Sequence, residues 1–260
     1  MRVENTVVVV TGAGSGIGAA MARRFAAEDA RRVVVVDRDA DAAERVAAAC
    51  GPAGRAACLD VTDADATEVL IDRIEARDGP IALYCANAGV GVPEGPYPSD
   101  EVWQRLWAVH VMAHVHAARA LVPRMKPRGG GWLLFTASAA GLLSQPDAPY
   151  AVTKHAALAH AEWLAIAHGA DGIGVSCLCP GIIDTPMLQA ETAERRAAMS
   201  AGQSLMTPDE LALAVVEGLA DERFLILTHP QVAHWEAARV ADRARWIRGM
   251  QRAWADSSSD

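Results

Sequence analysis

Short apolar runs alternate along this chain with longer, alanine-rich segments of mixed polarity. Near-continuous valine, leucine and isoleucine runs are typical of parallel strands whose two faces are both covered by helices. Strands are expected at Thr6–Thr11, Arg32–Asp37, Arg55–Leu59, Ile81–Ala86, Trp132–Ser138, Ile173–Cys179 and Phe224–Thr228. Helices are expected between them, for example at Gly16–Asp29, Ala40–Cys50, Asp63–Arg77, Trp103–Met125 and Tyr150–His168. The alternation predicts a single α/β domain over residues 1–260, with a Rossmann-like, doubly wound parallel sheet of about seven strands flanked by helices.

Composition and charge narrow the class of protein. Hydrophobic residues make up 52% of the 260 positions, which is enough for one large core. A formal net charge of −8 argues against nucleic acid and anionic membranes as partners. No apolar run approaches the ~20 residues of a membrane span, and no leader-like segment opens the chain. The five cysteines, an odd number, indicate reduced thiols, so we expect a cytoplasmic protein without disulfides or a bound metal.

A glycine-rich segment directly follows the first expected strand and opens the first expected helix. It reads Thr11-Gly12-Ala13-Gly14-Ser15-Gly16-Ile17-Gly18. Glycines at these positions allow a tight turn and a close approach of the backbone to a pyrophosphate, while the helix N-terminus supplies free N–H groups and a partial positive charge. The strand–loop–helix context favours a dinucleotide site over a merely flexible loop.

Acidic residues end the second and third expected strands. A carboxylate at Asp37 can accept hydrogen bonds from both hydroxyls of an adenosine ribose and would repel a 2′-phosphate. This favours NAD over NADP, although the neighbouring Arg38 could attract a phosphate. Asp60 and Val61 are expected to bracket the adenine ring; for Asp60, a helix or turn cap is the alternative.

A tyrosine and a lysine lie four positions apart in the helix expected after the fifth strand. Tyr150 and Lys154 therefore share one helix face. A phenol, with a pKa of about 10, is a poor base at neutral pH, and a nearby ammonium group favours its phenolate. Ser138, at the end of the fifth expected strand, offers a hydroxyl that can hold a substrate oxygen. The three side chains together predict proton transfer at an alcohol or carbonyl oxygen.

With these motifs the chain resembles the short-chain dehydrogenase/reductase family, in its common branch of about 250 residues. The matching segments are Thr11-Gly12-x-x-x-Gly16-Ile17-Gly18, Asp60-Val61, Asn87-Ala88-Gly89, Ser138 with Ala140-Gly141, Tyr150-x-x-x-Lys154 and Pro180-Gly181-x-x-x-Thr185. The resemblance implies hydride transfer to or from nicotinamide C4 and a homodimer or homotetramer. The helix Tyr150–His168, apolar nearly all round, independently favours an oligomer.

The resemblance also assigns roles to individual residues. Ser138 is expected to orient the substrate oxygen, Tyr150 to transfer the proton, and Lys154 to tune the tyrosine and hold the nicotinamide ribose. Further cofactor contacts are expected from Asn87, Ala88, Gly89, Pro180, Gly181, Ile183 and Thr185.

Three positions depart from the family pattern. Ala86 replaces the first asparagine of the usual Asn-Asn-Ala-Gly, and the interval from Ser138 to Tyr150 is one residue short. His110 stands where the family has an asparagine that holds a water relaying protons to the lysine. Because neutral imidazole also has one donor and one acceptor, we expect His110 to bond a backbone group near Asn87 and a water toward Lys154. The alternative is that it only fills space.

The substrate is expected to be a small, uncharged, fairly apolar secondary alcohol or ketone, because no cluster of Arg or Lys marks a phosphate or carboxylate site. Contacts are expected from 90–93, from 141–145 and from a lid at 186–207. A helical extension at about 230–255, carrying Trp235, Trp246, Met250 and Trp254, is expected to seal the pocket or a subunit interface. The alternatives are an epimerase or dehydratase on the same scaffold, which would need a larger C-terminal domain, and a non-enzymatic NAD-binding regulator.

Overall fold

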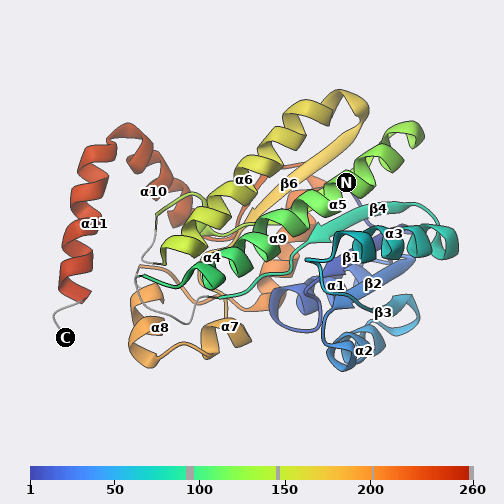
Figure 1. The fold of residues 1–260 in the computed structure, drawn as a ribbon, viewed down its shortest axis with the longest axis horizontal. Helices are drawn as coiled ribbons and strands as arrows, with labels where there is room; N and C mark the ends of the chain where they lie inside the picture. The colour runs from blue at the N-terminus through green and yellow to red at the C-terminus, as the bar shows by residue number, and fades with distance from the viewer. Residues whose placement is uncertain (92–96, 145–146, 201, 258–260) are drawn as a thin grey trace.

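A computed structural model describes residues 1–91, 97–144, 147–200 and 202–257 (Figure 1). Seven parallel strands form one sheet in the order β3-β2-β1-β4-β5-β6-β7. This confirms the expected doubly wound, Rossmann-like architecture. The strands are β1 (Val7–Thr11), β2 (Arg32–Asp37), β3 (Gly54–Cys58), β4 (Ile81–Ala86), β5 (Gly131–Thr136), β6 (Ile173–Cys179) and β7 (Leu225–Leu227).

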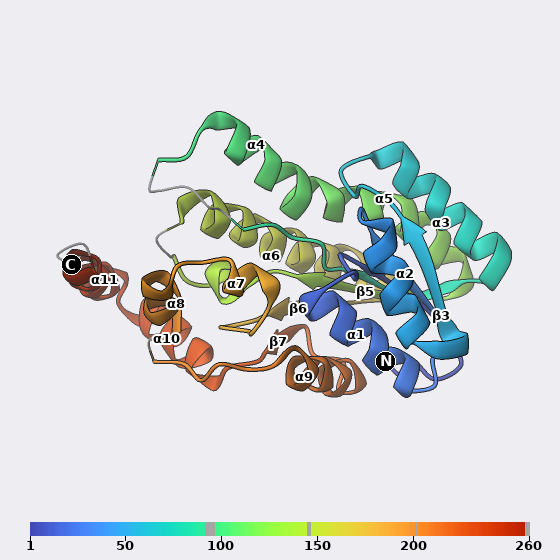
Figure 2. The same ribbon diagram turned by 90° about the horizontal axis from the view of Figure 1, so that it is seen from below.

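Helices cover both faces of the sheet (Figure 2). One face carries α1 (Gly16–Ala27), α2 (Ala40–Ala49) and α9 (Pro208–Ala220). The other carries α3 (Ala64–Asp78), α5 (Ala113–Met125) and α6 (Ala148–His168), and α4 (Asp100–Trp107) packs against α6. The remaining helices are α7 (Pro186–Gln189), α8 (Ala193–Ser200), α10 (Pro230–Ala241) and α11 (Arg243–Ser257).

The valine run of β1 shows how the sequence builds the two cores. Val7 and Val9 pack into the cluster formed with α3, α5 and α6. Val8 and Val10 point the other way, into the cluster formed with α1, α2 and α9. Successive strand residues face opposite sides of a sheet, so a strand buried on both faces must be apolar at every position.

Two expected elements end or divide differently in the structure. β5 ends at Thr136, so Ser138 lies beyond the strand and begins the short 3-10 turn Ala139–Gly141. The long helical stretch around His110 is interrupted, because the π-helical turn Ala108–Met112 separates α4 from α5. Such a turn re-aims the side chains that follow it and is frequent at functional sites.

The C-terminal helices extend away from the sheet. Figure 1 shows α10 and α11 at one end of the molecule, with α11 running alongside the body at a distance from the strands. Val232 in α10 is fully buried and anchors that helix in the core. Among the helices that the structure describes, none has both the length and the apolarity to cross a lipid bilayer.

Candidate active site

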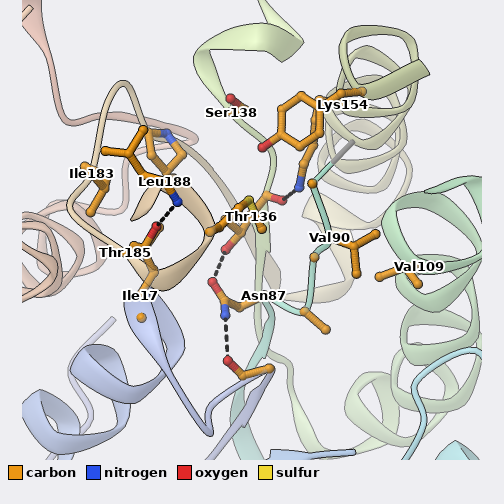
Figure 3. A pocket seen from close by; sticks show the side chains of 18 of the residues that line it. Ile17, Asn87, Val90, Val109, Thr136, Ser138, Lys154, Ile183, Thr185 and Leu188 are labelled. Atoms are coloured by element: carbon orange, nitrogen blue, oxygen red, sulfur yellow. Dashed lines mark hydrogen bonds between the residues drawn. The ribbon is translucent and has the colours of Figure 1, made fainter. Parts of the chain in front are cut away.

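A cavity of about 1530 Å³ opens at the carboxyl ends of the strands. It lies where the strand order reverses between β1 and β4, the place where ligands bind in open α/β sheets. The structure brings to its wall all the expected site residues except His110: Gly12, Ser15, Gly16, Ile17, Gly18, Asp37, Asp60, Val61, Asn87, Ala88, Gly89, Ser138, Tyr150, Lys154, Pro180, Gly181, Ile183 and Thr185. Figure 3 shows several of these side chains directed into the cavity.

The glycine loop has no room for larger residues. Gly12 and Gly16 adopt positive φ angles of 62° and 51°. A Cβ on Gly12 would lie 2.7 Å from the Cα of Ala88, and one on Gly18 would lie 2.3 Å from the carbonyl oxygen of Gly12. The side chain of Ser15 does not cap α1, so the first N–H groups of that helix are free to bind phosphate oxygens. The loop therefore fits a dinucleotide pyrophosphate.

The adenosine end of the cavity contains two carboxylates with different surroundings. Asp37 Oδ2 accepts a hydrogen bond of 2.8 Å from the backbone N–H of Gly14, and Oδ1 accepts one of 3.1 Å from Asp39. Asp60 instead caps its own turn, accepting from the backbone N–H and hydroxyl of Thr62, and these bonds lower the pKa of its carboxyl. Asp60 thus fulfils the alternative expectation of a turn cap while also lining the cavity.

Asn87 joins three neighbouring strands beneath the cavity. Its side-chain amide donates to the carbonyl oxygen of Thr11 at 3.0 Å, and its carbonyl accepts from the Thr136 hydroxyl at 3.1 Å (Figure 3). The hydroxyl of Thr11 in turn accepts from the backbone N–H groups of Asn87 and Ala88. Thr11 opens the glycine-rich motif but was assigned no role of its own, and Thr136 was not singled out. Their position at strand ends beside the glycine loop and Ser138 was the available signal.

Lys154 is buried and anchored at the end of β5. Its ammonium donates to the carbonyl oxygen of Thr136 at 2.9 Å and lies 5.6 Å from the centre of the Tyr150 ring. Burial lowers the pKa of Lys154 to about 8. The one-turn spacing of the two residues therefore places the lysine beside the phenol, as the motif predicts.

The pKa of Tyr150 is raised in the protein alone, because burial disfavours the phenolate. The Ser138 hydroxyl opposes this rise, whereas the carboxylate of Asp147 adds to it. The lowering expected from Lys154 is thus not a property of the protein by itself. The positive nicotinamide ring expected in the cavity would add a second charge, besides the Lys154 ammonium, that can favour the phenolate.

His110 is fully buried behind the cavity wall. Its Nε2 accepts a hydrogen bond of 3.1 Å from the backbone N–H of Val90, a backbone group near Asn87 as expected. Its Nδ1 lies 2.9 Å from the Thr153 hydroxyl, which donates to the carbonyl oxygen of Pro149. The expectation of a water toward Lys154 on this nitrogen is therefore wrong, because Thr153 already occupies it. Burial holds the pKa of His110 well below 6.5.

The substrate half of the cavity is mainly apolar. Its walls come from the turn after β5, from the lid and from the C-terminal helices: Leu143, Met187, Leu188, Met199, Trp235, Trp246 and Met250. Polar and charged groups there are Glu101, Gln104, Arg105, Ser144, Asp147, Glu191 and Gln203. The expected contacts at Val92, Pro93 and Gln145 and the side chain of Trp254 lie outside the described residues.

The known proteins that this chain resembles decide its family. Residues 6–196 match the family model described as short chain dehydrogenase. The chain belongs to this family. It is therefore an oxidoreductase, and the family resemblance identified from the motifs is confirmed.

Alignments with relatives that are named for an activity extend over most of this short-chain dehydrogenase. It is 40% identical over 238 residues to a 1-deoxy-11-beta-hydroxypentalenate dehydrogenase of Streptomyces exfoliatus, covering 88% of this chain and 85% of that one. A cis-4-hydroxycyclohexanecarboxylate dehydrogenase of Sinomonas cyclohexanicum is 34% identical over 218 residues, covering 80% and 87%. Both names describe oxidation of a hydroxyl group.

Solved structures show the same architecture. A short-chain dehydrogenase/reductase from Burkholderia phymatum, in complex with NAD, superposes with a TM-score of 0.84 at 28% identity and covers 93% of this chain and 95% of its own. A 3-ketoacyl-(acyl-carrier-protein) reductase from Brucella melitensis, complexed with NADH, superposes with a TM-score of 0.79 at 29% identity, covering 88% and 98%.

Proposed function

We propose that this enzyme interconverts a secondary alcohol and a ketone by NAD-dependent hydride transfer on a small, uncharged, fairly apolar substrate. The observation that carries the proposal is the placement of Ser138, Tyr150 and Lys154 on one cavity that also contains the glycine loop. The Asp37 carboxylate at the adenosine end supports NAD over NADP, since it would repel a 2′-phosphate. Relatives solved with NAD and NADH agree with this choice.

Each of the three side chains has one task. Bound NAD supplies the hydride acceptor at its nicotinamide C4. In the oxidation direction, Ser138 donates a hydrogen bond to the substrate oxygen and so positions its hydroxyl. The Tyr150 phenolate removes the hydroxyl proton as the hydride leaves the carbon, and it returns that proton to the oxygen in ketone reduction. Lys154, fixed by the Thr136 carbonyl, would stabilise the phenolate by its charge and would hold the nicotinamide ribose when NAD is bound.

The substrate class follows from the wall of the substrate half. Methionine, leucine and tryptophan side chains dominate it, and such a wall binds a hydrocarbon skeleton better than a charged one. Two of the three carboxylates there, Asp147 and Glu191, are paired with Arg195 of the lid, and the third, Glu101, lies on α4. Among the described residues of this half, Arg105 is the cation not engaged in such a pair. A substrate carboxylate would have to use it.

The same proposal includes a homodimer or homotetramer in the cytoplasm. Val152, Trp163 and Ile166 lie on one face of α6 and are 47%, 58% and 78% exposed in the single chain. An apolar stripe of this kind is typical of a surface that another subunit covers. The five thiols are unpaired, as expected in a reducing compartment.

The test is a panel of alcohols and ketones followed by NADH absorbance. Cyclic secondary alcohols with and without a carboxylate separate the uncharged substrate class from the charged one. Tyr150→Phe should lower kcat by roughly 10²- to 10⁴-fold and leave NADH binding, measured by fluorescence, nearly unchanged. Tyr97→Phe is the matched control, because Tyr97 is 96% exposed. A Tyr150→Phe variant that keeps more than about a tenth of wild-type kcat would overturn the mechanism.

The panel also separates the alternatives. A non-enzymatic regulator would bind NADH but turn over no member of the panel. An epimerase or dehydratase would convert substrate without net change in NADH absorbance. Net oxidation or reduction that depends on Tyr150 excludes both.

A further inference from the structure

Arg195 of the lid forms an ion pair with the residue that precedes the catalytic helix. Its Nη2 donates to both carboxylate oxygens of Asp147, at 2.9 Å and 3.2 Å. Its Nε donates to Glu191 at 2.6 Å, and this bond fixes the guanidinium within α8 and the turn before it. The pair therefore ties the lid to the N-terminus of α6, across 48 residues of chain.

Asp147 stands three positions before Tyr150 and lines the same cavity. Its negative charge opposes ionisation of the phenol, which burial already disfavours. A guanidinium on the carboxylate offsets that charge and also holds it in one orientation. The positive charge of Arg195 in the lid therefore affects the ionisation of the Tyr150 phenol through Asp147.

We propose that Arg195 is a positioning residue of the reaction, which neutralises and orients Asp147 so that this carboxylate does not oppose formation of the Tyr150 phenolate. The inference rests on the proposed function of Tyr150 as acid/base. Arg195 itself lies outside the cavity wall and touches no reacting atom. Its effect on rate must therefore pass through Asp147.

Other charged groups face Tyr150 and must be separated from this effect. Lys154 shares its helix and, with a pKa of about 8, loses its charge at a lower pH than the Tyr150 phenol, whose pKa is raised. His110 lies edge-on to the phenol, with ring centres 5.4 Å apart, but stays neutral because burial lowers its pKa well below 6.5. Glu101 and Arg105 reach the cavity from α4, which packs against α6. A readout specific for tyrosine is needed.

The chain has three tyrosines, which makes Tyr150 visible by its own absorbance. Tyr84 is buried, which raises its pKa far above the ordinary value, and Tyr97 can be removed as Tyr97→Phe. In that background, tyrosinate absorbance near 295 nm, followed against pH in the full chain, titrates Tyr150. The variants are Arg195→Gln, Arg195→Lys, Asp147→Asn and the double variant Arg195→Gln/Asp147→Asn.

Opposite shifts are the expected result. Arg195→Gln should raise the Tyr150 midpoint by about 0.3 to 1 pH unit, because Asp147 is left uncompensated. Asp147→Asn should lower it, Arg195→Lys should stay close to wild type, and in the Asp147→Asn background Arg195→Gln should have little effect. Arg196→Gln removes the same charge from α8, but its guanidinium bonds backbone carbonyls of Gln189 and Glu191, so it should not move the midpoint.

The pH midpoint of kcat/KM for alcohol oxidation should shift in the same directions. A purely structural role would lower the rate in both single variants without opposite shifts. An unmoved midpoint in Arg195→Gln, or shifts of the same sign in both single variants, would overturn the inference. The proposed function is tested separately. It fails if Tyr150→Phe keeps its activity although the Arg195 and Asp147 variants, which retain Tyr150, still show the expected shifts of the absorbance midpoint.

Discussion

His110 and Thr153 meet at 2.9 Å in the core, although 43 residues separate them in the chain. Because Nε2 of the imidazole accepts from Val90 N–H, its proton lies on Nδ1 and is donated to the Thr153 hydroxyl. The hydroxyl in turn donates a hydrogen bond to the carbonyl oxygen of Pro149, next to Tyr150. The ring thus links the loop after β4 to the first turn of the catalytic helix.

Replacing His110 should therefore act through this link. His110→Asn keeps a donor and an acceptor and should retain activity within a few-fold. His110→Leu leaves the partly buried Val90 N–H unpaired, which should cost about 1 kcal/mol of unfolding free energy and lower kcat/KM roughly 10-fold. Urea unfolding and kinetics at pH 6 to 9 measure both. Thr153→Val, which removes only the hydroxyl, is the matched variant; a Leu variant equal to wild type in both assays would show that His110 only fills space.

Asp37→Ala should weaken NAD binding and relax cofactor choice. The carboxylate would bind the adenosine ribose and already holds the Gly14 N–H, so its loss removes about 1.5–3 kcal/mol, which is about 10- to 150-fold in the Kd of NAD. Binding of NADP should improve, because the repulsion is gone and Arg38 lines the same wall. Asp41→Ala, an exposed acidic residue in the first turn of α2, controls for the charge change. Wild-type activity with NADPH equal to that with NADH would contradict the assignment of NAD.

His114 should make the protein sensitive to acid. It is 1% exposed beside Phe135, and burial lowers its pKa to about 3. Below about pH 6.5 the unfolded chain binds a proton at His114, whereas the native state does not. The contribution of neutral His114 to the free energy of unfolding is therefore complete above that pH and declines as the pH falls toward 3. The slope from this residue is up to about 1.4 kcal/mol per pH unit.

The difference in the free energy of unfolding between wild type and His114→Leu isolates the contribution of this histidine to the pH dependence. Urea unfolding at pH 7.5, 6.5, 5.5 and 5 should show the Leu variant gaining relative stability as the pH falls. His234→Gln, at an exposed position of α10, should show no such trend. Parallel pH curves for wild type and His114→Leu would mean that His114 titrates normally.

The C-terminal helix α11 should shape substrate range. Trp246 and Met250 of this helix line the cavity, so truncation after Asp242 opens the substrate half while leaving the buried Val232 in place. KM for bulky cyclic alcohols should rise several-fold, with a smaller change for short acyclic ones. Trp246→Ala should reproduce the effect, and Ile247→Ala, at a 49% exposed neighbour, should not. If the KM values and the mass in solution are both unchanged, α11 contributes neither to the substrate pocket nor to a subunit interface and only packs on its own subunit.

Local patterns in the sequence determined the fold class and most of the candidate site. The apolar runs determined which segments are strands buried on both faces, because side-chain direction alternates along a strand whatever its neighbours. The spacing of Tyr150 and Lys154 was equally local, since one helical turn depends only on nearby residues.

Only the tertiary structure decided the partners that are distant in the chain. Thr153 took the place of a water beside His110, and Arg195 met Asp147 from the lid. Both pairs depend on the order of the strands and on how the lid packs over α6, and no periodicity within one segment encodes these. Ionisation is decided at the same level: the pKa of Tyr150 depends on burial and on charges from separate segments, so its spacing from Lys154 predicts proximity but not the direction of the shift.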